Sequence, residues 1–107
     1  MSERVLEELF QTILSRQGAD PASSHTAAVL AKGPAYAARK MGEEALEAVV
    51  EGVRGDTAAL AAESADLLYH LLVLWAAAGI APKDVFDILA KRRGTSGIAE
   101  KASRPKA

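Results

Sequence analysis

The stretch from residue 58 to residue 78 constrains the fold most, because its apolar residues surround it almost completely when it is drawn as a helix. Its polar residues are few: Glu63, Ser64, Asp66, Tyr69 and His70. A helix that is apolar on nearly every side is buried in protein. A chain of 107 residues offers little to bury it against, so we expect a second chain to cover part of it.

The rest of the chain also favours helices. Alanine is frequent, and β-branched residues never form an alternating run. We therefore expect one all-α domain over residues 1–107, with four to five helices in a bundle completed by homodimerisation and with residues 94–107 as a basic tail. The expected helices cover residues 3–16, 24–32, 34–54, 57–79 and 80–93.

Composition excludes several classes of protein. The net charge of −1 gives no broad basic face, so we expect no nucleic-acid partner. Cysteine is absent, which excludes disulfides and thiolate metal sites. The N-terminus does not resemble a signal peptide, and the longest apolar run, Leu71–Ala78, is shorter than a membrane span. We expect a soluble, cytoplasmic protein that does not enter a membrane.

Two pairs of acids stand out from this background. Glu44 and Glu47 are three residues apart, and so are Glu63 and Asp66. Residues three apart lie on one face of a helix. If the two helices pack side by side, the four carboxylates converge, and they repel one another unless a cation lies between them. Oxygen ligands of this kind suit Mg²⁺, with Mn²⁺ as a substitute.

The simpler alternative is that these acids lie on solvated helix faces, which would be ordinary for residues 34–54. It is weaker for Glu63 and Asp66, because acids on a mostly buried helix are costly unless they are paired or bound to metal. If the four acids do cluster, we expect at least one carboxyl pKa to be raised in the absence of metal. Glu43 borders the same face and is a candidate general base, or else a member of a surface ion pair.

Other residues could complete a phosphate site. The available cations are Lys32, Lys40, Arg92 and Arg93, although the two arginines could equally serve to match a helix dipole. His70 could be a ligand or a base, but a histidine among leucines is more often a core residue held by hydrogen bonds. The sequence has no GxxxxGK[ST] loop, so it does not indicate a kinase or a motor ATPase.

These motifs resemble a known family. Glu43-Glu44-x-x-Glu47 followed by Glu63-x-x-Asp66 is similar to the EExxE and ExxD signature of the all-α, MazG-like nucleoside triphosphate pyrophosphatases. Within that superfamily the chain most resembles the phosphoribosyl-ATP pyrophosphatases of histidine biosynthesis. The resemblance covers nearly the whole chain and includes these further stretches: Ser24-His25-Thr26, residues 65–74, residues 92–98 and residues 100–104.

The resemblance implies Mg²⁺-dependent hydrolysis of the α–β phosphoanhydride of 1-(5-phosphoribosyl)-ATP, which gives 1-(5-phosphoribosyl)-AMP and pyrophosphate. It implies metal ligation by Glu44, Glu47, Glu63 and Asp66, and a catalytic set that comprises Glu43, Glu44 and Glu47. The family usually has tyrosine where this chain has His25, which puts an aromatic contact there in doubt. The resemblance also implies a stand-alone form of the enzyme and a homodimer or higher homo-oligomer.

Two other functions stay open at this point. One is a house-cleaning dNTP pyrophosphatase of the same superfamily, and the other is a helical dimerisation module with no catalytic activity. A panel of substrates separates the two enzymes, and a metal titration separates both enzymes from the module.

Overall fold

A computed structural model describes residues 4–93, 101, 102 and 104, and all the regular structure in that part of the chain is helical. This confirms the all-α class. The helices are α1 (Val5–Ser15), α2 (His25–Lys32), α3 (Pro34–Arg54), α4 (Thr57–Ala78) and α5 (Pro82–Arg92). Most of the tail expected over residues 94–107 lies outside the described residues.

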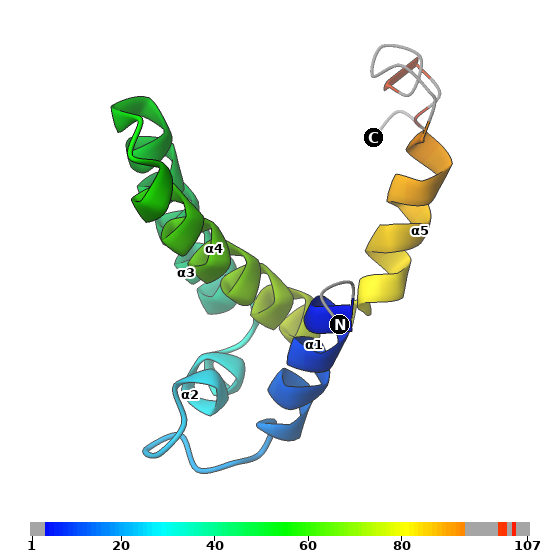
Figure 1. Cartoon of the computed structure of the whole chain (residues 1–107). Coiled ribbons are helices and arrows are strands. Elements are labelled where there is room, and N and C mark those ends of the chain that lie inside the picture. Colours follow the sequence, from blue (N-terminus) through cyan, green and yellow to red (C-terminus); the bar gives the residue numbers. More distant parts are fainter. Residues whose placement is uncertain (1–3, 94–100, 103, 105–107) are drawn as a thin grey trace.

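Helices α3 and α4 form the hairpin on which the other helices are arranged (Figure 1). The turn between them consists of Gly55, which has a φ of 78°, and Asp56. Glycine suits that left-handed conformation because it has no Cβ. The side chain of Asp56 accepts a hydrogen bond of 3.0 Å from the backbone N–H of Ala59, and this bond caps the first turn of α4. A short turn of this kind makes α3 and α4 antiparallel neighbours.

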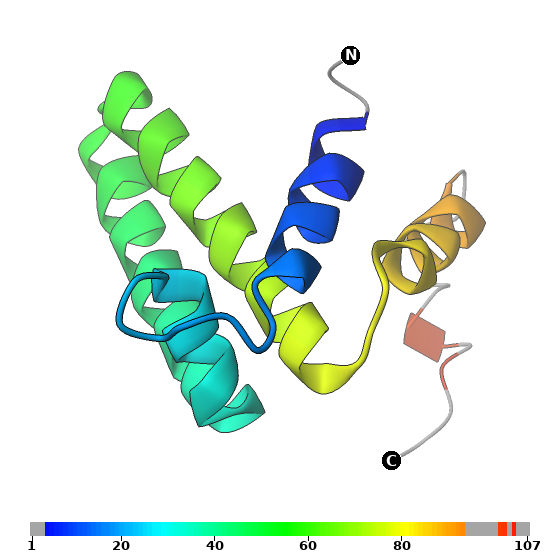
Figure 2. The ribbon, with the colours of Figure 1, turned by 90° about the horizontal axis from the view of Figure 1, so that it is seen from below.

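The hydrophobic core lies around the C-terminal half of α4. Leu72 and Val73 are each 1% exposed, and they belong to the same buried cluster as Ile13 of α1 and Val29 of α2. Helices α1 and α2 therefore cover the lower part of the α3–α4 hairpin, and the end of the hairpin near Gly55 projects beyond them (Figures 1 and 2).

Helix α5 diverges from the hairpin. In Figure 1, α4 and α5 form the two arms of a V, and Figure 2 shows α1 between them. The expected fifth helix, residues 80–93, begins two residues too early. The N–H of Ile80 donates instead to the carbonyl of Trp75 in the C-terminal cap of α4, and Pro82 is the first residue of α5.

The exposure of α3 and α4 differs from the usual pattern of a core helix. Leu46, Val49 and Val53 of α3 are 64%, 59% and 84% exposed, and Leu68 of α4 is also exposed. The sequence predicted an uncovered apolar face for α4, whereas most of these exposed apolar side chains belong to α3. By length and composition alone, α4 could cross a membrane, although its longest uninterrupted apolar run is short. Its acids and its packing against α1, α2 and α3 identify it instead as the central helix of this fold.

Candidate functional site

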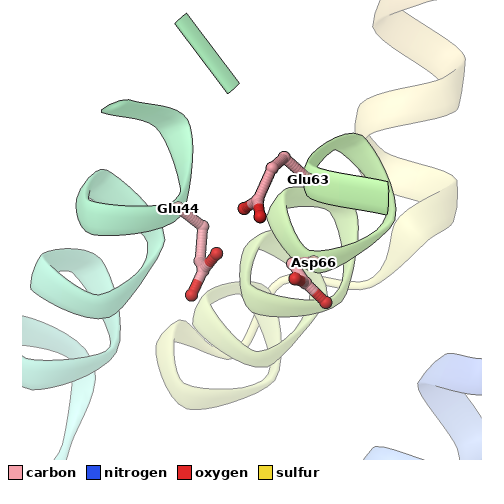
Figure 3. Close-up of side chains that lie close together, drawn as sticks. All are labelled: Glu44, Glu63 and Asp66. Carbon is pink, nitrogen blue, oxygen red and sulfur yellow. The ribbon is translucent and has the colours of Figure 1, made fainter. Parts of the chain in front are cut away.

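The α3–α4 hairpin brings three of the predicted carboxylates together. Glu44 comes from α3, and Glu63 and Asp66 come from successive turns of α4. One oxygen of each carboxylate lies within 4.8 Å of the others. Figure 3 shows Glu44 and Glu63 extending into the space between the two helices, with Asp66 beside them. The convergence predicted from the spacing is confirmed for these three acids.

The fourth predicted ligand, Glu47, lies at the edge of this set. It is exposed, one turn after Glu44, and it interacts with both Glu44 and Glu63. The pKa of Glu63 is raised to about 7. The largest cause is a hydrogen bond with Glu47, followed by burial and by the charges of Glu47, Asp66 and Glu44. Burial first, and then Glu47, raises the pKa of Glu44. The expectation of raised carboxyl pKa values is confirmed.

The carboxylates fit a hard divalent cation. Oε2 of Glu44 and Oε2 of Glu63 are buried and have no hydrogen-bond partner. A buried, unpaired carboxylate oxygen is costly, and the exposed carboxylate of Asp66 beside these two adds mutual repulsion. A cation bound between them would satisfy the free oxygens and remove the repulsion, and an all-oxygen ligand set matches the preference of Mg²⁺ or Mn²⁺.

His70 supports this site from the core. It is 8% exposed, and its Nε2 atom lies 3.9 Å from Oε1 of Glu44. Burial is the main cause that lowers its pKa, so the ring is neutral near pH 7. The sequence offered His70 as a ligand, a base or a core residue held by hydrogen bonds. The structure places it in the core, with Nδ1 buried and unpartnered.

The N-terminus of α2 packs against the same histidine, and the sequence gave no sign of this contact. The His25 ring meets the His70 ring edge to face, with centroids 5.9 Å apart. The hydroxyl groups of Thr26 and Tyr69 share a hydrogen bond. A contact between residues so distant along the chain leaves no periodicity that could reveal it. The aromatic contact placed in doubt at position 25 exists here between two histidines.

Glu43 lies outside the converging set. Its Oε1 atom is 3.0 Å from Nζ of Lys40, and this hydrogen-bonded ion pair is the main cause that lowers the pKa of Glu43 and raises that of Lys40. Of the two roles considered for Glu43, the structure therefore contains the surface ion pair. The same contact holds Lys40 one turn before Glu44 on α3.

The remaining predicted cations are not gathered at the carboxylates. Nζ of Lys32 lies 4.4 Å from the centroid of the Tyr36 ring, a cation–π contact at the α2–α3 junction. Arg92 and Arg93 lie at the end of α5, on the far side of α1 from the hairpin (Figure 2). Within one chain, Lys40 is therefore the predicted phosphate-binding residue that lies beside the acidic set.

The carboxylates lie between α3 and α4, away from the hollows described for this chain. Two hollows in the described residues, of about 300 and 490 Å³, lie near Phe10 and Ala81 and near Gly18 and Leu30, and neither is lined by a carboxylate. The arrangement of oxygen atoms can hold a cation.

Comparisons with known proteins agree with this geometry. Residues 6–93 match the family described as phosphoribosyl-ATP pyrophosphohydrolase. The chain is 58% identical over 104 residues to a phosphoribosyl-ATP pyrophosphatase of Azospirillum brasilense. These residues cover 97% of this chain and 94% of that protein. It is also 57% identical over 102 residues to a phosphoribosyl-ATP pyrophosphatase of Ruegeria sp. (strain TM1040). These residues cover 95% of this chain and 97% of that protein. The match includes α3 and α4 and hence the carboxylate set, and the chain therefore belongs to the phosphoribosyl-ATP pyrophosphohydrolase family.

Proposed function

We propose that this chain hydrolyses the α–β phosphoanhydride of 1-(5-phosphoribosyl)-ATP and releases 1-(5-phosphoribosyl)-AMP and pyrophosphate, the second step of histidine biosynthesis. The observation that carries the proposal is the set of three carboxylates within 4.8 Å, donated by two helices of a chain that belongs to this family. The proposed location is the cytoplasm.

The proposed cofactor is Mg²⁺, held by Glu44, Glu63 and Asp66, with Glu47 as a fourth ligand at the edge of the set. A cation there would neutralise phosphate charge, polarise the phosphorus atom and lower the pKa of a bound water. Glu44 and Glu63 offer the cation buried oxygens that have no hydrogen-bond partner, and Nε2 of His70 lies 3.9 Å from the other oxygen of Glu44.

The remaining side chains have roles that follow from their positions. Lys40 is the proposed first contact for a substrate phosphate, because it lies one turn before Glu44 and carries a charge at neutral pH. Glu43 stays ionised beside Lys40, and it is the proposed acceptor of the proton from the attacking water. Its lowered pKa makes it a weak base, so its contribution should be smaller than that of any metal ligand.

A substrate panel tests the proposal. We expect pyrophosphate release from phosphoribosyl-ATP with a kcat/KM at least about 100-fold above that for any of the four dNTPs, and no release by the Glu44→Gln variant. Rapid turnover of dNTPs with none of phosphoribosyl-ATP would identify a house-cleaning pyrophosphatase instead. No turnover of any nucleotide, together with no response to Mg²⁺ or Mn²⁺, would favour the dimerisation module.

We also propose that the chain acts as a homodimer. The supporting observation is the row of exposed apolar side chains on α3, together with Leu68 on α4. Isolated apolar residues on a surface need no explanation, but a contiguous row marks an interaction surface.

A further inference from the structure

Two cations lie against one aromatic ring at the junction of α2 and α3. Nζ of Lys32, the last residue of α2, is 4.4 Å from the centroid of the Tyr36 ring, and Cζ of Arg39 is 5.7 Å from the same centroid. Lys32 and Arg39 are exposed, whereas Tyr36 is half-buried and packs against the hydrophobic core. The ring therefore holds both charges near one another at the surface.

The backbone fixes the junction that brings Lys32 to this ring. Gly33 has a φ of 93°, which suits a residue without a Cβ, and Pro34 is the first residue of α3. The N–H of Ala37 donates to the carbonyl of Gly33 over 3.1 Å, and Ala37 is buried. The end of α2 is consequently tied to the first turn of α3, and the side chain of Lys32 reaches a ring on the next helix.

The two charges have no acidic partner in the part of the chain that the structure describes. Its ion pairs include neither Lys32 nor Arg39, whereas the neighbouring Lys40 is paired with Glu43. The two ring contacts place the charges no more than about 10 Å apart, which is about the Debye length at 0.1 M salt, so the charges repel one another. An anion bound to both would remove this repulsion, and phosphate is a strong acceptor for both side chains.

These cations are aligned with the carboxylate site along α3. Lys40 follows Tyr36 by four residues and Glu44 follows Lys40 by four, so the three side chains form one row on the helix. In Figure 1, α3 leads from the end of α2 along α4. Tyr36 lies about 12 Å before Glu44 on the helix axis, at 1.5 Å per residue. A ligand that reaches both places must carry negative charge at two separated positions.

We propose that Lys32 and Arg39, held by Tyr36, form a second anion site that binds the 5-phosphate of the phosphoribosyl group while the triphosphate lies at the carboxylates. 1-(5-Phosphoribosyl)-ATP carries phosphate at both ends, with adenosine and a second ribose between them. A dNTP carries phosphate at one end, so it leaves one of the two sites empty. The guanidinium group of Arg39 binds two phosphate oxygens at once, and Lys32 adds a further donor. The identity of the ligand rests on the proposed function, whereas the anion site does not.

Substrate preference tests the assignment. The combined Lys32→Met and Arg39→Met variant removes both charges and keeps two unbranched apolar side chains beside Tyr36. We expect the ratio of kcat/KM for phosphoribosyl-ATP to kcat/KM for dATP to fall at least about 30-fold, because only the longer substrate makes the lost contacts. The loss should appear mainly in KM, since the 5-phosphate does not change during the reaction.

The matched control is Arg54→Met, which removes a cation at the other end of α3 and should keep this ratio within about two-fold of wild type. Circular dichroism verifies that the double variant keeps its helices. An unchanged ratio in the double variant, or an equal loss with both substrates, would overturn the assignment of the 5-phosphate to this site.

A titration without turnover tests the anion site separately from the proposed function, and it needs only the wild type. Ribose 5-phosphate added to the metal-free protein should shift the amide resonances of residues 32–40 saturably, whereas ribose, which lacks the phosphate, should not. The double methionine variant should lose this response. No saturable shift, or the same shift with ribose, would overturn the site even if the enzyme hydrolyses phosphoribosyl-ATP. A saturable shift in a protein that does not hydrolyse phosphoribosyl-ATP would support the anion site and contradict the proposed function.

Discussion

Nε2 of His70 lies 3.9 Å from Oε1 of Glu44, so a nearly buried ring in the core stands directly behind a carboxylate of the acidic set. The ring is itself held on its other sides by His25 and Tyr69, whose centroids lie 5.9 Å and 5.0 Å from its own. Packing between α2 and α4 therefore places the His70 ring beside Glu44 of α3.

The first prediction follows from this contact. His70→Phe keeps a ring in the core and removes the nitrogen that faces Glu44, so the affinity for Mn²⁺ should fall about 10-fold or more. Calorimetric titration of Mn²⁺ measures this, with circular dichroism to confirm the fold. His25→Phe, which changes a ring one step further from Glu44, should keep the wild-type affinity. Equal affinities for wild type and His70→Phe would show that the contact does not orient the carboxylate.

The second prediction concerns pH. The pKa of Glu63 is about 7 in the folded chain against an ordinary value of 4.5, so the folded chain binds this proton more tightly than the unfolded chain. The stabilisation is complete below the ordinary value and is lost as the pH rises through about 7. The melting temperature of the metal-free protein should therefore fall more between about pH 5 and pH 8 than that of Glu63→Gln.

The comparison between the two proteins is needed because His70, whose pKa is lowered, contributes a pH dependence of the opposite sign. If the wild type and Glu63→Gln showed parallel melting curves across that range, Glu63 would not hold a proton in the fold. Saturating Mg²⁺ should remove the fall of the wild-type melting temperature with pH that is due to Glu63, because a bound cation favours the ionised carboxylate.

The third prediction separates stability from activity within the acidic set. Replacing an acid by its amide removes one of several converging charges, so at about pH 8 at least one such variant should be more stable than the metal-free wild type. The four variants are Glu44→Gln, Glu47→Gln, Glu63→Gln and Asp66→Asn. Each should also lose most pyrophosphatase activity. If thermal unfolding showed all four to be destabilised without metal, the repulsion inferred from the cluster would be absent.

The fourth prediction concerns the turn that aligns the two helices. Asp56→Ala removes the hydrogen bond to the Ala59 N–H and should lower the free energy of unfolding by about 0.5–2 kcal/mol. Urea denaturation measures the loss. Glu7→Ala, an exposed acid within α1, should change the same quantity by less than about 0.5 kcal/mol. A loss for Asp56→Ala no larger than that of Glu7→Ala would mean that the cap adds nothing to the hairpin.

The sequence predicted those features that depend on neighbouring residues. The capping role of Asp56, the end of α4 at Gly79 and the shared face of Glu63 and Asp66 all follow from local hydrogen bonding and helical period. The convergence with Glu44 needed one further step, that two helices joined by a two-residue turn pack side by side.

Features set by distant contacts could not be predicted in this way. The periodicity of α3 places Leu46 and Val49 on an apolar side and Glu44 on an acidic side, but it does not show which side packs against α4. In the structure the acidic side packs against α4. The contact between His25 and His70 and the divergence of α5 also depend on packing between elements far apart in the chain. For the same reason the sequence identified Arg92 and Arg93 as candidate phosphate-binding residues but could not predict where they lie relative to the carboxylates.

The central claim is that Glu44, Glu63 and Asp66 hold one divalent cation, and calorimetric titration of Mn²⁺ into the wild type, Asp66→Asn and Glu7→Gln tests it most directly. Asp66→Asn removes a clustered carboxylate, whereas Glu7→Gln removes an exposed one on α1. We predict saturable binding to the wild type and Glu7→Gln with the same affinity, and at least about 10-fold weaker binding to Asp66→Asn. Equal binding by all three proteins, or no binding by the wild type, would contradict the claim.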